Sequence, residues 1–70
     1  MTIETKYNIG DEVWFMNDGE PTSERIVRID VERYEQKQYV EYTVVLSDVI
    51  LTSFYEQELF PTKEELLKSL

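Results

Sequence analysis

The sequence predicts a mainly β domain of four to five antiparallel strands that ends in one short helix. Three observations support this fold class. Apolar and polar residues alternate with a period of two over residues 24–34 and again over 39–46, as expected for half-buried strands. An Asp-Gly turn at Asp18 and Gly19 lies between two stretches rich in strand formers. After Pro61, a Thr-x-x-Glu pattern precedes closely spaced leucines, which is typical of a helix start.

The first predicted strand covers residues 12–16 and carries large apolar side chains on both of its faces. Val13 and Phe15 are expected on one face, which enters the core. Trp14 and Met16 are expected on the other. We expect the C-terminal helix to cover this second face. If it is uncovered, Trp14 and Met16 form an exposed partner-binding anchor, because tryptophan is enriched in binding hot spots.

The second and third strands form a predicted β-hairpin over residues 24–46, with a polar loop at residues 35–38. Pro21 is expected to delay the start of this hairpin. Its apolar face is predicted to comprise Val27, Ile29, Val31, Val40, Tyr42, Val44 and Leu46. Tyr34 and Tyr39 flank the loop near Arg33 and Lys37. They are expected either to stabilise the hairpin as a cross-strand pair or to stack on a peptide or a base.

The C-terminal third is predicted to contain a strand at residues 49–55, a 3₁₀ turn at 56–58 and a helix at about residues 63–70. β-Branched and aromatic residues favour the strand. Thr62 is the expected N-cap of the helix, with Glu65 completing a capping box. Two further features of the helix are an i,i+4 ion pair and a buried apolar stripe. The pair is Glu64 with Lys68, and the stripe is Leu66, Leu67 and Leu70.

The composition allows one folded domain over residues 1–70 and excludes several kinds of chemistry. The chain is 41% apolar and has room for a single small core. It contains no cysteine and no histidine, so disulfides, thiolate nucleophiles and imidazole bases or ligands are excluded. The two glycines stand nine residues apart, which excludes a glycine-rich phosphate loop. We therefore expect a protein that is not an enzyme and has no cofactor.

The carboxylate pairs in the sequence are expected to be solvated turn residues. They are Asp18 with Glu20 and Glu56 with Glu58, and close pairs arise by chance in a chain with 15 acidic residues. The segment 17–20 has oxygen ligands but lacks the Asp-x-Asp-x-Asp-Gly spacing of a calcium loop. We therefore expect neither a catalytic pair nor a metal site.

The net charge of −8 is unevenly distributed along the chain. Residues 22–38 are neutral overall, whereas residues 1–21 and 39–70 each carry a charge of −4. Such a field repels nucleic acid and anionic membranes and attracts basic partners, although it also serves solubility. The chain has no apolar run of membrane-spanning length and no secretory signal, so we expect no membrane association and a cytoplasmic location.

Three segments resemble small SH3-like barrels of the KOW or Tudor-like kind. They are IGDEVWF at residues 9–15, YTVVL at 42–46 and EQEL at 56–59. The resemblance covers residues 7–60 and implies an SH3-like barrel. The ending LFPTKEELLKSL is similar to that of a group of small uncharacterised bacterial and phage-type proteins without an assigned activity. KOW-type barrels that bind RNA are usually basic, so this acidic chain is not expected to bind nucleic acid directly.

The leading functional hypothesis is a small non-catalytic interaction module that binds a protein partner. The predicted partner-binding residues are Trp14, Met16, Tyr34 and Tyr39. A homo-oligomer is a variant of this hypothesis, because a second copy can cover a two-sided apolar strand. The alternative is an acidic decoy that mimics nucleic acid and occupies a basic site on a DNA- or RNA-handling protein. Direct nucleic-acid binding is the third hypothesis, through Arg25, Arg28, Arg33 and Lys37.

Overall fold

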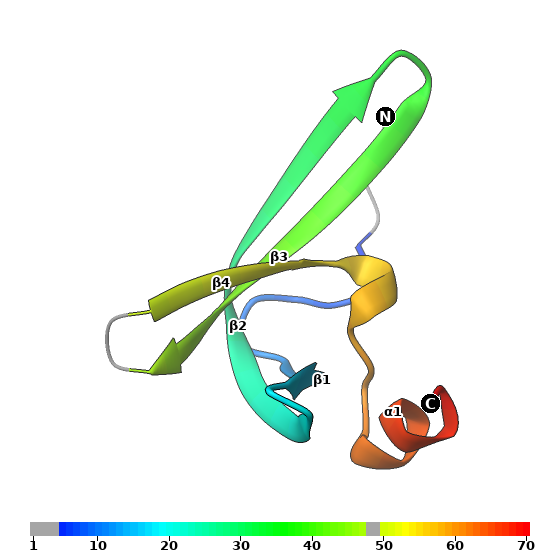
Figure 1. Cartoon of the computed structure of the whole chain (residues 1–70). Helices are drawn as coiled ribbons and strands as arrows, with labels where there is room; N and C mark the ends of the chain where they lie inside the picture. The colour runs from blue at the N-terminus through cyan, green and yellow to red at the C-terminus, as the bar shows by residue number, and fades with distance from the viewer. Residues whose placement is uncertain (1–4, 48–49) are drawn as a thin grey trace.

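The computed structural model describes residues 5–47 and 50–70 and shows one antiparallel sheet followed by a short helix (Figure 1). The strands are β1 (Glu12–Asn17), β2 (Glu20–Tyr34), β3 (Lys37–Ser47) and β4 (Ile50–Tyr55), and they lie in this order in the sheet. A 3₁₀ turn, η1 (Glu56–Glu58), and the helix α1 (Lys63–Lys68) complete the chain. The predicted mainly β class with one C-terminal helix is confirmed.

Tight turns connect the first three strands. Asp18 and Gly19 both have positive φ angles, 50° and 79°, between the paired residues Asn17 and Glu20. Glycine adopts this geometry without strain, and aspartate tolerates it better than most residues. The β2–β3 loop is shorter than predicted, because Lys37 already pairs with Tyr34.

β2 begins earlier than the sequence indicated. It includes Pro21, which pairs with Met16 of β1. Among the described strands, this part of β2 pairs with β1, and its pairing with β3 begins only at Ile26. A proline is tolerated there because its missing N–H can face the unpaired side.

The core is formed by side chains from the first three strands and from the segments that flank the sheet. Its buried members are Tyr7, Val13, Phe15, Ile26, Tyr42, Val44 and Leu59, and Ile29, Val40, Leu46 and Phe54 pack against them. The prediction that Val13 and Phe15 enter the core is therefore confirmed. The hairpin of β2 and β3 extends beyond this core, because its pairing continues to the turn while β4 ends opposite Glu41 (Figure 1).

A register shift in β2 corrects one predicted face. Val27 was expected on the apolar face but is 47% exposed, whereas Ile26 is 1% exposed. The shift lies between Ile26 and Arg28, so that Ile26 pairs with Val44 while Ile29 pairs with Tyr42. An extra residue at a β-bulge changes which residues of the strand point inward.

The C-terminal segment returns to β1 before the helix starts. Trp14 and Phe60 exchange two backbone hydrogen bonds, of 2.8 and 2.9 Å. The predicted cap of α1 is confirmed, since the Thr62 hydroxyl accepts a hydrogen bond from the backbone N–H of Glu65. The predicted leucine stripe is wrong in part, because Leu66 is buried but Leu67 and Leu70 are exposed. A six-residue helix has fewer than two turns, so one side chain suffices to anchor it.

The ion pair on α1 also differs from the prediction. The Lys68 Nζ atom lies 4.0 Å from Oε1 of Glu65. The partner is therefore the residue after Glu64, which was the expected one. Both side chains are largely exposed, so this contact contributes little to stability.

Candidate functional site

The four predicted partner-binding residues lie in two separate places. Trp14 and Met16 are on β1, where both are half-buried. Tyr34 and Tyr39 lie at the far end of the β2–β3 hairpin, where both are exposed. The structure thus offers two candidate surfaces rather than one.

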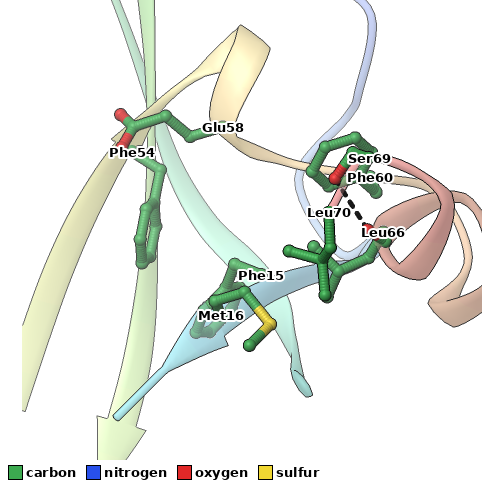
Figure 2. Close-up of a pocket in the computed structure, with 8 residues that line it drawn as sticks. All are labelled: Phe15, Met16, Phe54, Glu58, Phe60, Leu66, Ser69 and Leu70. Carbon is green, nitrogen blue, oxygen red and sulfur yellow. Dashed lines mark hydrogen bonds between the residues drawn. The ribbon is translucent and has the colours of Figure 1, made fainter. Parts of the chain in front are cut away.

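The first surface is an apolar pocket of about 210 Å³ between β1, β4 and α1. Figure 2 shows residues of β1, β4 and α1 converging on it. Its lining comprises Phe15, Met16, Phe54, Glu58, Phe60, Leu66, Ser69 and Leu70. Leu66 of α1 and the two residues that follow the helix, Ser69 and Leu70, line the same pocket as Met16. Trp14 is not in the lining, and its backbone pairs with that of Phe60. The predicted helix cover over both Trp14 and Met16 is therefore found only beside Met16.

The polar side chains of this pocket already have partners. The Ser69 hydroxyl donates to the carbonyl of Leu66 at 2.7 Å, the contact dashed in Figure 2. The Glu58 carboxylate accepts from the backbone N–H of Tyr55 at 2.9 Å. The described lining therefore suits an apolar group and brings no nucleophile together with a base.

The second surface is a row of three exposed tyrosine rings, which we name the tyrosine row: Tyr34, Tyr39 and Tyr55. The ring centroids of Tyr34 and Tyr39 are 6.3 Å apart, and those of Tyr39 and Tyr55 are 6.4 Å apart. The rings come from β2, β3 and β4 respectively, so the row crosses three strands. Tyr34 is 63% exposed, Tyr39 42% and Tyr55 44%.

Tyr55 was not among the predicted site residues. The sequence placed it at the end of a strand, but its neighbours depend on how β4 pairs with β3. In the structure it pairs with Glu41, on the sheet face opposite to Tyr42 and Phe54. The spacing of Leu51, Ser53 and Tyr55, two residues apart in a strand, already indicated in the sequence that they share a face.

Carboxylates surround one end of the tyrosine row. Glu41 lies directly opposite Tyr55, and Glu32 lies directly opposite Tyr39. The negative charge of Glu41, followed by partial burial and the charges of Glu32 and Glu58, raises the pKa of Tyr55 above its ordinary value. Lys37 pairs with Tyr34 at the other end of the row. The row therefore runs from an acidic end at β4 to a basic residue at the turn.

The cations proposed for nucleic-acid binding are partly engaged within the protein. Arg25 donates to the carbonyl of Gly10 at 2.8 Å, and Arg28 forms an ion pair with Asp30 at 2.8 Å. Arg33 and Lys37 line a second pocket, of about 320 Å³, at the hairpin turn. Glu35 lies in the same pocket and reduces its positive charge. These contacts weaken the basic patch.

A buried network joins Tyr42, Glu56 and the N-terminal segment. The Tyr42 hydroxyl donates to the Glu56 carboxylate at 2.6 Å and accepts from the backbone N–H of Tyr7 at 3.3 Å. The Tyr7 hydroxyl donates to the carbonyl of Leu59. Glu56 was expected to be a solvated turn residue, but it is half-buried and holds this network together. Burial and the hydrogen bond to Glu56 raise the pKa of Tyr42 to about 12.

Alkaline pH is expected to destabilise the fold through Tyr42. Its pKa is about 12 in the folded chain and 10.0 in the reference state, so the unfolded chain releases the proton first. The contribution of the protonated Tyr42 hydroxyl to the free energy of unfolding is therefore fully present below about pH 10 and is lost as the pH rises towards 12. Urea unfolding of wild type and Tyr42→Phe between about pH 9 and pH 12 tests this expectation. The decline should be shallower in Tyr42→Phe and unchanged in the exposed control Tyr34→Phe, and equal slopes in all three proteins would contradict it.

The described parts of the chain contain neither a membrane-spanning helix nor an acidic metal cluster. In residues 5–47 and 50–70, no helix is long and apolar enough to cross a bilayer. Over the same ranges, no three acidic side chains are grouped so that they could hold a metal ion. Comparison of the chain with protein-family models, with curated proteins and with solved structures finds no match.

Proposed function

We propose that this protein is a non-catalytic interaction module that holds a protein partner through the tyrosine row. The observation that carries the proposal is the position of three contacting rings on an exposed sheet face. Large aromatic side chains gathered on a surface are characteristic of interaction sites. They lie on the hairpin and on β4, where they are not part of the buried core.

The proposed scaffold is a small SH3-like barrel. The consecutive order of four antiparallel strands supports this proposal. So do the η1 turn after β4 and the bridge that brings Phe60 back to Trp14. On such a scaffold the hairpin that carries Tyr34 and Tyr39 extends beyond the core as an arm (Figure 1). The arm presents side chains without needing a catalytic cleft.

Trp14 and Met16 are secondary candidates for partner binding. Both are half-buried, and Met16 shares a pocket with Leu66 of α1. Their contribution is therefore expected to be smaller than that of the tyrosine row. The prediction that a second copy of the chain covers β1 stays a prediction. The same holds for the cytoplasmic location.

A capture experiment with matched variants tests the proposed function. Wild type, Tyr34→Thr with Tyr39→Thr, and Leu67→Ala are immobilised and exposed to lysate of the cells that produce the protein. We expect one protein to be retained by wild type and Leu67→Ala and lost from the double tyrosine variant. Leu67 is an exposed apolar residue of α1 and serves as the control. Equal retention on all three surfaces would overturn the proposal.

The acidic decoy is the competing function, and the same experiment distinguishes it. Its support is the net charge of −8. A decoy complex should be released by about 0.5 M salt, because screening removes most surface electrostatics at that strength. It should also be insensitive to Tyr34→Thr and Tyr39→Thr. A salt-sensitive, tyrosine-independent complex with a basic DNA- or RNA-handling protein would replace our proposal with this one.

A further inference from the structure

The charge around the tyrosine row limits what can bind to it. Glu32 and Glu41 pair directly with Tyr39 and Tyr55, and Glu58 is close enough to influence the Tyr55 hydroxyl. Phosphate groups are repelled by such a field, whereas Lys and Arg side chains are attracted to it. The faces of tyrosine rings also attract cations. Carboxylates and rings therefore favour the same kind of ligand, a basic one.

The ring spacing indicates the conformation of that ligand. Successive centroids are 6.3 and 6.4 Å apart. In an extended chain, side chains on the same side repeat every two residues, or about 6.7 Å. An extended segment lying along the row would thus place side chains i and i+2 over neighbouring rings. In a helix, the side chains that share a face are three or four residues apart and lie about 5–6 Å from one another, a shorter repeat than the 6.3 and 6.4 Å between the rings.

The change of charge along the tyrosine row indicates which ligand side chain lies over which ring. The acidic carboxylates accompany Tyr39 and Tyr55, whereas Lys37 is paired with Tyr34. Cations are therefore favoured over Tyr39 and Tyr55 and disfavoured over Tyr34. A neutral residue suits the Tyr34 position.

From these observations we propose that the tyrosine row binds an extended basic segment of a partner protein, with Arg or Lys at positions i and i+2 over Tyr39 and Tyr55. This inference rests on the proposed function and names the class of partner. Arginine fits best, since its planar guanidinium group stacks on a ring while its N–H groups bond to a carboxylate. Glu41 and Glu32 supply those carboxylates.

A pair of synthetic peptides tests the spacing separately from the charge. The first is acetyl-Gly-Thr-Arg-Thr-Arg-Thr-Gly-amide, in which the arginines alternate. The second, acetyl-Gly-Thr-Arg-Arg-Thr-Thr-Gly-amide, has the same composition and charge but points its arginines to opposite sides when extended. Binding is followed by ¹H–¹⁵N NMR titration of the full chain. We expect the alternating peptide to bind roughly two- to fivefold more tightly, which is the worth of one exposed cation–π contact.

Matched variants then assign the binding to the row. Tyr39→Thr should weaken binding of the alternating peptide roughly two- to fivefold, while Leu51→Thr, an exposed change on the same sheet face, should leave it unchanged. Glu32→Gln with Glu41→Gln should weaken binding more than Glu12→Gln with Glu20→Gln, which removes the same charge elsewhere. The largest amide shifts should lie at Tyr39, Glu41 and Tyr55.

Four results would overturn the inference. The first is equal affinity for the two peptides, and the second is peptide binding that Tyr39→Thr does not weaken. The third is tighter binding of a single-stranded oligonucleotide than of either peptide. The fourth is a set of amide chemical-shift changes at the tyrosine row that depend on protein concentration alone. The last would identify a second copy of this chain as the occupant. If these results appear while a lysate protein is still retained through Tyr34 and Tyr39, the proposed function stands and only the class of partner is wrong.

Discussion

Phe15→Ala is expected to lower the free energy of unfolding by about 3–5 kcal/mol. Phe15 is 1% exposed, and its ring centroid lies 4.5 Å from that of Phe54. It therefore forms a contact between β1 and β4, the two outer strands of the sheet. A domain of this size has a total stability of roughly 3–10 kcal/mol. The variant should consequently be partly or wholly unfolded in water.

Phe15→Leu provides a measurable version of the same test. Leucine keeps most of the apolar volume, so the expected loss is about 1–2 kcal/mol and the protein should still fold. Both variants are compared with wild type by urea unfolding, followed by the fluorescence of the single tryptophan, Trp14. If the free energy of unfolding of Phe15→Ala lies within about 1 kcal/mol of the wild-type value, the expectation is wrong. The surrounding side chains would then have filled the space left by the ring, and Phe15 would not be needed to hold β1 against β4.

Features that depend on neighbouring residues in the chain could be predicted from the sequence. The alternation in β1 correctly placed Val13 and Phe15 in the core. The Asp-Gly pair correctly marked a reversal with positive φ angles. Thr62 correctly marked the start of α1. Each of these depends on local backbone geometry or on a period of two, so the residues involved carry the information themselves.

Features that depend on register could not be predicted in the same way. Tyr34 and Tyr39 were found because they flank a turn, but their contact with Tyr55 requires the pairing of β4 with β3. Leu67 and Leu70 have helical spacing from Leu66, yet the short helix packs through Leu66. Glu56 looked like a turn residue, and only the fold brings Tyr42 to it. A single sequence shows which residues are apolar and leaves their partners undetermined.

Ile26→Ala is expected to lower the free energy of unfolding much more than Val27→Ala, because the bulge in β2 places Ile26 rather than Val27 in the core. A regular strand with the predicted face would make Val27 a core residue and Ile26 a surface residue. With the bulge, Ile26→Ala should cost about 2–4 kcal/mol, whereas Val27→Ala should change stability by no more than about 0.5 kcal/mol. The contrast is between neighbouring β-branched residues in one strand, so strand propensity affects both variants similarly.

The physical reason for the contrast is the pairing around the bulge. Ile26 faces Val44, which is fully buried, and both belong to the core cluster. Removing its side chain leaves a cavity between β2 and β3, whereas truncating Val27 removes methyl groups that already contact water. Urea unfolding of the two variants measures the difference directly. A larger loss for Val27→Ala would mean that β2 has no bulge here and that Val27 points into the core in place of Ile26. Equal losses would also contradict the bulge, because Val27 would then be as well packed as Ile26. Ile29 and the hairpin beyond it keep the same inward face in either register.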